Sequence, residues 1–126
     1  MSIPAEIIAS KQISLTTFRK DGTPVPTAVW HVASGDTITT VSAAAAGKVK
    51  RIRNNPRVEI TACDVRGNVP PGAQTIAGTA VLLPDSQTDA ARRLLESRYV
   101  TARIGGTLAR LFHIKRPAAI GIVITV

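Results

Sequence analysis

The stretch AGKVKRIRNNPR, residues 46–57, is the segment from which the rest of the chain can be placed. Val49 and Ile52 stand three positions apart, a spacing that puts both side chains on one face of a helix. The sequence Asn-Asn-Pro at 54–56 then ends the helix before the apolar run 58–63. We therefore expect one short helix held between two strands.

This helix is strongly basic, and a glycine stands at its start. The glycine is Gly47, and the cations are Lys48, Lys50, Arg51 and Arg53. The first N–H groups of a helix have no partner within it, so together with nearby lysines they can bind a phosphate. The alternative is a solvated basic face that caps a sheet, because runs of charge are common on surfaces. Periodicity alone leaves both interpretations open.

Apolar and alternating segments on both sides of this helix predict six β-strands. They span residues 12–19, 24–33, 37–42, 57–65, 75–83 and 118–126. The pair Asp21-Gly22 and the sequence at 34–36 indicate tight turns, so the first three strands should form an antiparallel meander. Pro24 and Pro26 lack an N–H, which places the start of the second strand at a sheet edge or beside a ligand.

Three more helical segments and one close backbone approach are expected. Ser2 as a cap and Pro4 in the first turn indicate a short lid helix with an apolar stripe of Ile3, Ile7 and Ile8. A helix over about 88–99 should turn Ala91, Leu94, Leu95 and Arg98 inward, and a weaker pattern follows at 102–112. Gly78 indicates a bulge or a close approach of backbone. The last strand is almost wholly apolar and should be buried on both faces or at a subunit contact.

The expected fold class is mainly β with short helices, in one domain over residues 1–126. Six strands in a chain of this size favour a closed antiparallel barrel, because closure removes exposed edges. The core must be aliphatic, since 44% of residues are hydrophobic and only 3% are aromatic. The start MSIPAEIIAS lacks the features of a signal peptide and no membrane-spanning run exists, so we expect a cytoplasmic protein with no membrane partner.

The net charge of +8 implies an anionic partner. Nucleic acid is the first suspect by charge alone, but the aromatic residues argue against it. Phe18, Trp30, Tyr99 and Phe112 are scattered and not interleaved with the cations, unlike the rings on which single strands stack. A small polyanionic ligand fits the charge at least as well, and no nucleic-acid partner is expected.

No catalytic group or metal site stands out in the sequence. His31 and His113 are expected to be packing or surface residues, and Cys63 a small buried thiol. One cysteine and two histidines are too few for a zinc site, and the single cysteine cannot form an internal disulfide. If the protein is an enzyme, a bound cofactor must supply the chemistry.

Two blocks of the chain resemble a known family. They are ISLTTFRKDGTPVPTAVW at 13–30 and GKVKRIRNNPRVEITACDVRG at 47–67, separated by a strand that ends in Val41-Ser42. In this order they resemble the F420-dependent branch of the pyridoxamine 5'-phosphate oxidase-like, PPOX-class flavin and deazaflavin oxidoreductases. The resemblance implies a six-stranded antiparallel split β-barrel of the FMN-binding type. It also implies a homodimer with two cofactors in the clefts between subunits.

The resemblance further implies where coenzyme F420 or FMN would bind. Lys48 matches the phosphate-binding lysine, and Lys50 and Arg51 would lie near the phosphate and the oligoglutamate tail of F420. The strand around Trp30 would face the ring system with its backbone, and Ser42 would lie near the ribityl chain. The implied cofactor-binding residues are Thr27, Ala28, Val29, Trp30, Ser42, Gly47, Lys48, Lys50 and Arg51.

The run Ala43–Ala46 departs from the family pattern, since relatives commonly place a hydroxyl or an arginine there. Backbone N–H groups and lysines would have to hold the phosphate without those donors. FMN, with one phosphate as its main charged anchor, loses more than polyanionic F420, so the departure favours F420 and leaves FMN as the alternative.

The implied activity is that of an F420-dependent reductase acting on a small, conjugated organic substrate. Deazaflavin carries hydride, so no catalytic acid or base in the chain is required. The substrate would stack on the ring in the dimer cleft, bounded by Trp30, His31 and the loop 67–74. An FMN-dependent oxidase or reductase of the same fold and a non-catalytic cofactor-binding protein are the alternatives.

Overall fold

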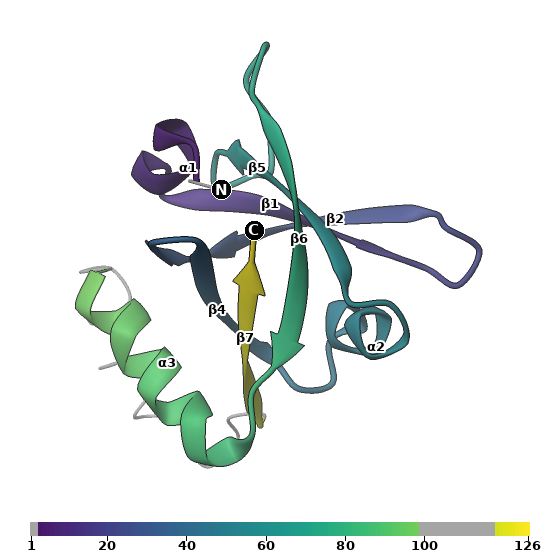
Figure 1. The fold of residues 1–126 in the computed structure, drawn as a ribbon, viewed down its shortest axis with the longest axis vertical. Coiled ribbons are helices and arrows are strands. Elements are labelled where there is room, and N and C mark those ends of the chain that lie inside the picture. Colours follow the sequence, from purple (N-terminus) through teal and green to yellow (C-terminus); the bar gives the residue numbers. More distant parts are fainter. Residues whose placement is uncertain (1–2, 99–117) are drawn as a thin grey trace.

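The computed structural model describes residues 3–98 and 118–126, in which an antiparallel sheet is flanked by short helices (Figure 1). In chain order the elements are α1 (Ala5–Ala9), β1 (Gln12–Phe18), β2 (Pro24–Trp30), β3 (Val32–Ser34), β4 (Thr37–Ala43), α2 (Gly47–Asn54), β5 (Arg57–Cys63), β6 (Thr75–Leu82), α3 (Asp85–Arg98) and β7 (Ala119–Thr125). The strand order is β2-β1-β5-β6-β7-β4-β3. The expectation of a mainly β fold with short helices is confirmed.

The predicted second strand, 24–33, is two strands in the structure. β2 ends at Trp30, β3 begins at Val32, and His31 alone stands between them. β2 pairs with β1, whereas β3 pairs with β4 at the opposite edge of the sheet. Both predicted hairpin turns are therefore confirmed, but the sheet has seven strands instead of six, and the two hairpins do not form one continuous meander.

In the described residues the sheet is rolled, but no strand pairing joins its two edges. Because β2 and β3 are consecutive, the two edges of the sheet must come within one residue of each other, and Figure 1 shows β1 and β2 running across β6 and β7. The Thr40 hydroxyl on β4 donates to the carbonyl of Trp30 at 2.7 Å, so a side chain links the two edges. The expected closed barrel is thus corrected to a rolled sheet in which β2 and β3 each pair on one side only.

The inner face of the rolled sheet carries an aliphatic core. Its fully buried members are Ile7, Ile13, Leu15, Ile38, Val58, Ile60, Ile122 and Ile124. Val49 and Ile52, the pair that predicted the basic helix, are 0% and 3% exposed. That helix is α2, and Asn55 ends it by donating its N–H to the carbonyl of Arg51 at 2.8 Å. The prediction of a short basic helix between strands is confirmed.

The predicted lid helix is α1, with a narrower apolar stripe than expected. Ile3 and Ile7 are buried in the core, but Ile8 is 47% exposed. Pro4 occupies the N-cap position and provides no side-chain hydrogen bond, while the expected cap Ser2 lies outside the described residues.

Helix α3 begins at Asp85, earlier than predicted, because the carbonyl of Pro84 accepts the N–H groups of Gln87 and Thr88. Its buried face is formed by Thr88, Ala91 and Leu95. Leu94 is 44% exposed, so its expected inward position is wrong. The helix predicted at 102–112 lies outside the described residues. No helix in the described part of the chain is long and apolar enough to cross a membrane.

Strand β7 is covered on both faces, as its apolar sequence predicts. Ile122 and Ile124 point into the core and are 0% exposed. On the other face, a Cβ added at Gly121 would lie 3.2 Å from the Cβ of Ala91 on α3. The N–H of Gly121 also donates to the Thr88 hydroxyl at 3.0 Å. The missing side chain at Gly121 is what lets α3 approach the sheet.

His31 is the residue at which the chain crosses from β2 to β3, and hydrogen bonds of His31 and Arg98 stabilise this crossing. His31 is 0% exposed, and its Nε2 lies 2.8 Å from the carbonyl of Ile7. Because a carbonyl can only accept, Nε2 carries the hydrogen. Burial, and then the charge of Arg98, lower the pKa of His31 to about 4, although the bond to Ile7 opposes this shift. The neutral ring is a packing residue, as expected.

Arg98 joins the end of α3 to two other elements. Its guanidinium donates to the carbonyl oxygens of Ile8 at 2.8 Å, Ser10 at 3.0 Å and His31 at 2.5 Å. One side chain therefore ties α3 to the end of α1 and to the crossing between β2 and β3.

We expect the stability of the protein to fall between pH 7 and pH 4.5 because of His31. Its pKa is about 4 in the folded chain and 6.5 as an ordinary histidine, so the unfolded chain binds the proton first as the pH falls. The free energy of unfolding should drop by about 2 to 3 kcal/mol over this range. Urea unfolding of the wild type and of His31→Gln across this range measures it, and the variant should lack this part of the pH dependence.

His113→Gln is the control, because His113 is the other histidine in the chain. Asp21 and Asp64 do not interfere, since their pKa values are lowered from 3.8 and their contribution is lost only at more acidic pH. An unchanged slope in His31→Gln would show that His31 is not the titrating group.

Gly78 should not tolerate a side chain. A Cβ at this position would lie 2.7 Å from Cγ2 of Ile124 and 3.0 Å from the carbonyl oxygen of Thr125, which confirms the predicted close approach. Gly78→Ala should therefore destabilise the protein by about 1 to 3 kcal/mol, measured by thermal or urea unfolding. Ala77→Val, on the exposed face of the same strand, is the control and should leave stability nearly unchanged. Equal stability of Gly78→Ala and the wild type would contradict this packing.

Candidate anion-binding site

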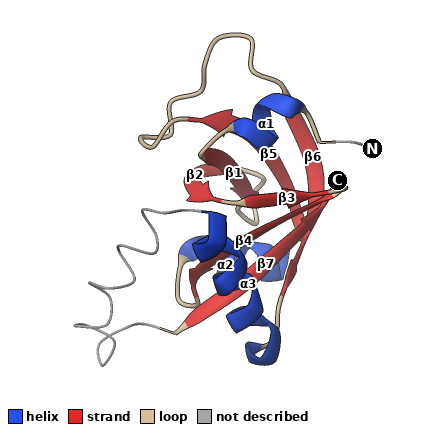
Figure 2. Cartoon of the chain, turned by 90° about the vertical axis from the view of Figure 1, so that its left-hand side faces the viewer, coloured by secondary structure: helices blue, strands red, loops and turns tan. Residues whose placement is uncertain are grey.

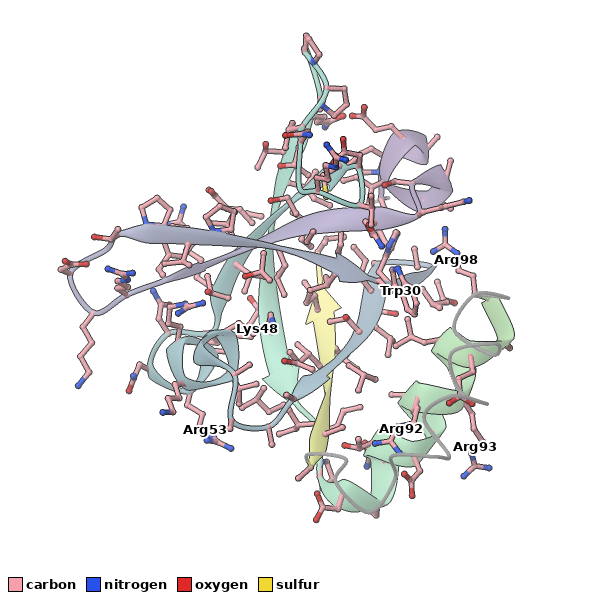
Figure 3. The ribbon with its side chains drawn as sticks, turned by 180° about the vertical axis from the view of Figure 1, so that it is seen from behind. Trp30, Lys48, Arg53, Arg92, Arg93 and Arg98 are labelled. Atoms are coloured by element: carbon pink, nitrogen blue, oxygen red, sulfur yellow. The ribbon has the colours of Figure 1, made fainter. Side chains whose placement is uncertain are left out.

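The start of α2 brings two cations to the inner side of the sheet. Lys48 Nζ donates to the hydroxyl of Ser42 on β4 at 3.3 Å, and Arg51 Nε donates to the hydroxyl of Thr17 on β1 at 2.6 Å. Ser42 and Thr17 are buried. Figure 3 shows Lys48 directed from α2 toward the middle of the sheet, whereas Arg53 points away from it. Lys48 and Arg51 thus connect α2 to β4 and to β1.

Arg51 folds back over the first residue of α2. A Cβ added at Gly47 would lie 2.8 Å from its Nη1, so a glycine is needed for this guanidinium position. Burial, and then the charge of Arg51, hold the pKa of Lys48 below its usual value of 10.5. The two positive charges are therefore close enough to repel each other.

No carboxylate compensates this pair within residues 3–98 and 118–126. The ion pairs found there join Arg57 to Glu59 and Arg92 to Asp89, and neither involves the site. The helix cap Ala46 offers no side-chain acceptor either. The first turn of α2 thus combines helix-start amide groups with two cations that no described carboxylate compensates, an arrangement that suits a phosphate.

The other two cations of α2 are separate from this pair. Lys50 and Arg53 are exposed, and neither has a described contact with Ser42 or Thr17. Lys50 follows Lys48 by two positions, which turns it about 200° around the helix. The structure therefore does not bring Lys50 to Lys48, and its role in binding stays a prediction. Lys50 and Arg53 form the solvated basic face that was the alternative interpretation of this helix.

Strand β2, which carries four of the predicted cofactor residues, is an edge strand. Pro24 and Pro26 lie opposite Phe18 and Thr16 of β1, and the sites of their missing N–H groups must face the open side. This agrees with the prediction of an edge at the start of the strand. Since backbone direction alternates along a strand, the N–H and C=O of Ala28 face the same open side.

The side chains of these four residues divide between the two faces of the sheet. Thr27 and Val29 lie opposite Leu15 and Ile13 and share their inner face. Ala28 and Trp30 lie on the outer face, and Trp30 is 36% exposed. At the end of β2 the open edge meets the inner face of β4 through the bond between Thr40 and Trp30. Thr40 and Ser42 stand two positions apart on β4 and are both buried, so the end of β2 and Lys48 contact the same face of that strand.

One residue expected near the substrate does not fit that role. His31 has no exposed surface and its ring is committed to the carbonyl of Ile7, so it cannot bound an open cleft. Two residues that the sequence did not single out, Thr17 and Thr40, contribute hydroxyl groups. Alternation along their strands indicates that they face inward, but nothing local indicates their partners Arg51 and Trp30.

Other chemistry is sparse around the site. No group of three or more His, Cys, Asp and Glu side chains that could hold a metal ion occurs in the described parts of the chain. Cys63 is buried, and burial and the neighbouring Asp64 raise the pKa of its thiol, which keeps it mostly protonated and slow to react at neutral pH. The arrangement can hold an anion and present a flat strand edge beside it.

This fold and site agree with a family that is recognisable from the sequence. Residues 3–119 match the family model described as pyridoxamine 5'-phosphate oxidase. Because the match spans nearly the whole chain, the protein belongs to the pyridoxamine 5'-phosphate oxidase-like family. No match was found among curated proteins.

Solved structures share the fold at low sequence identity. An F420 reductase is 21% identical, with a TM-score of 0.66, over 98% of this chain and 94% of its own. A FAD-binding protein from Mesorhizobium loti is 18% identical, with a TM-score of 0.64, over 100% of this chain and 90% of its own. The heme storage protein HutZ from Vibrio cholerae is 14% identical, with a TM-score of 0.68, over 95% of this chain and 84% of its own. Proteins with this fold therefore differ in the ligand they bind.

Arg51→Met should raise the pKa of Lys48, because it removes the positive neighbour that disfavours protonation. The pKa should stay below 10.5, since burial, the larger cause of the shift, remains. NMR titration of the lysine side-chain signals measures the change. Arg53→Met is the control, because it removes the same charge from the exposed side of α2. A pKa of Lys48 that is equal in both variants would show that the two cations do not interact.

Proposed function

We propose that the protein is an F420-dependent oxidoreductase that acts on a small, conjugated organic substrate. The observation that carries the proposal is the pair Lys48 and Arg51, brought to the start of α2 with no described carboxylate beside them. Bound deazaflavin would supply the chemistry by giving or taking hydride. The chain itself has to bind the phosphate and the tail, orient the ring and exclude water.

The residues present fit a polyanion better than a single phosphate. The hydroxyl of Ser42 already accepts from Lys48 and lies 3.2 Å from the carbonyl of Ala43, so it is a weak additional donor. The run Ala43–Ala46 adds no side-chain donor. Charge therefore has to provide most of the binding energy, which favours F420 with its several carboxylates over FMN. The exposed Lys50 can meet the oligoglutamate tail outside the half-buried pair of Lys48 and Arg51.

The ring of the cofactor would lie along the open edge of β2. The free backbone groups of Ala28 can hydrogen-bond polar ring atoms there, as Thr27, Val29 and Trp30 position the strand. We also propose that the protein is a homodimer with the cofactor in the cleft between subunits. Trp30 and Val81, which are 36% and 56% exposed, offer apolar surface on the outer face for such a contact.

Two other functions remain candidates for specific reasons. The phosphate of FMN could use the same two cations, which would give a flavin-dependent oxidase or reductase. A non-catalytic binding protein is the second candidate, because a solved structure of this fold is a heme storage protein. Both alternatives use the same binding site. The first differs from the main proposal in its cofactor, and the second differs in having no catalytic activity.

We expect Lys48→Ala and Arg51→Ala each to weaken F420 binding about tenfold or more, because each removes a half-buried charge that can donate a charge-assisted hydrogen bond to the phosphate. Arg53→Ala is the matched control on the same helix and should change binding little. Titration of purified protein with F420 and with FMN, followed by cofactor fluorescence at two salt concentrations, measures these affinities. Binding of F420 should be tighter than that of FMN and should weaken with salt.

Three outcomes would overturn parts of the proposal. Tighter binding of FMN would contradict the argument from the tail and identify a flavin enzyme. Equal effects of Arg51→Ala and Arg53→Ala would show that the phosphate does not bind at Lys48 and Arg51. Tight F420 binding without oxidation of reduced F420 by a panel of conjugated substrates would identify a binding protein instead of an enzyme.

A further inference from the structure

A cavity lies at the end of the molecule that is opposite to α2. It occupies about 570 Å³ between α1, the end of β5 and the connection from β5 to β6, and Figure 1 shows these elements together, away from α2. Small-molecule sites typically enclose some 300–1,000 Å³. The lining residues are Glu6, Ser10, Ala62, Cys63, Asp64, Asn68, Val69, Pro70 and Pro71. The cavity is open to solvent on one side, and it is large enough to hold a compact organic molecule against its walls.

The loop that forms one wall is fixed by its own hydrogen bonds. Asp64 Oδ1 accepts the N–H groups of Arg66 and Asn68, both at 2.9 Å, and its Oδ2 accepts from Nδ2 of Asn68 at 3.1 Å. These bonds lower the pKa of Asp64 and use its oxygens. Glu6 Oε1 accepts the N–H of Gln74 at 2.8 Å and so ties the far end of the loop to α1. The cavity has preformed walls.

Glu6 is the charged group that remains available in this cavity. Its Oε2 has no hydrogen-bond or ion-pair partner in the described chain, whereas Asp64 is occupied by the loop. The lining holds two carboxylates and no lysine, arginine or histidine, although the chain as a whole carries +8. Arg98 approaches Ser10 only through its backbone carbonyl. The cavity is thus a local acidic site on a basic protein.

The remaining walls are apolar. Ala62, Val69, Pro70 and Pro71 provide hydrocarbon surface, and Val69 is 47% exposed. Burial and the charge of Asp64 raise the pKa of the Cys63 thiol, so this wall carries no further negative charge at neutral pH. We propose that this cavity binds a compact organic cation, an aromatic or aliphatic amine, with its apolar part against the prolines and its ammonium group on Glu6.

The structure places residues 68–71 of the loop that was expected beside the substrate at this cavity instead, away from α2, so this site is separate from the proposed cofactor site. It takes the opposite charge and shares no lining residue with the region of Lys48. Its failure would leave the F420 proposal untouched, and the absence of F420 binding would leave this one untouched.

Cys63 makes the proposal testable without knowledge of the natural ligand. It is the only cysteine in the chain and it lines the cavity. We expect benzylamine to slow the reaction of Cys63 with a thiol reagent such as DTNB, in a saturable way, in the intact protein at fixed pH. Benzyl alcohol, which is neutral, should protect several-fold more weakly, and phenylacetate, an anion of similar size, should protect least.

Glu6→Gln separates charge from structure. Glutamine keeps an oxygen that can accept the N–H of Gln74, so the loop stays tied to α1 while the charge is lost. Protection by benzylamine should then weaken about fivefold, the size of a partly exposed ion pair, and approach that of benzyl alcohol. Glu59→Gln is the matched control, because Glu59 is paired with Arg57 and does not line the cavity.

The proposal fails if phenylacetate protects as well as benzylamine, or if Glu59→Gln has the same effect as Glu6→Gln. A second measurement guards against slow reaction of the buried thiol. In ¹H–¹⁵N spectra, benzylamine should shift the amides of Ala62, Cys63 and Val69 and leave those of Gly47 and Lys48 unchanged. No shift at millimolar benzylamine would overturn the proposal.

Discussion

The architecture depends on a covalent constraint, because one residue, His31, joins strands at opposite edges of the sheet. The chain leaves β2 and enters β3 at once, so the sheet has to roll until its edges meet (Figure 2). A polar ring and two peptide groups are buried at this point, and they need partners. The bond to Ile7 satisfies the ring, and Arg98 satisfies the carbonyl of His31 and ties α3 there.

The cofactor site that we propose follows from this incomplete closure. A sheet rolled until its edges pair would cover the backbone of β2, but within residues 3–98 and 118–126 no strand pairs with the outer side of β2, and the Thr40 hydroxyl bonds to the carbonyl of Trp30 at its end. Helix α2 comes directly after β4, so Lys48 reaches back to Ser42 and Arg51 crosses to β1. The same turn of helix that buries Val49 and Ile52 therefore places the cations.

The sequence predicted the elements whose formation depends on residues close together in the chain. The bounds of α2 followed from the spacing of Val49 and Ile52 and from the Asn-Asn-Pro sequence. The resemblance drawn from the blocks at 13–30 and 47–67 predicted the family whose model matches residues 3–119. The break at His31 gave no signal, since branched and aromatic residues continue on both sides of it. The contact of Arg51 with Thr17 and the cavity at Glu6 join residues far apart in sequence, so only the folded chain shows them.

Pro24 and Pro26 have a consequence for how the protein behaves among its own copies. An unpaired strand edge is a template on which strands of other molecules can add, and long open edges promote fibre growth. The prolines remove two N–H donors from the outward side of β2, so an incoming strand would find acceptors without matching donors. The chain can thus keep a strand edge accessible for a ligand and still resist edge-to-edge polymerisation at high concentration.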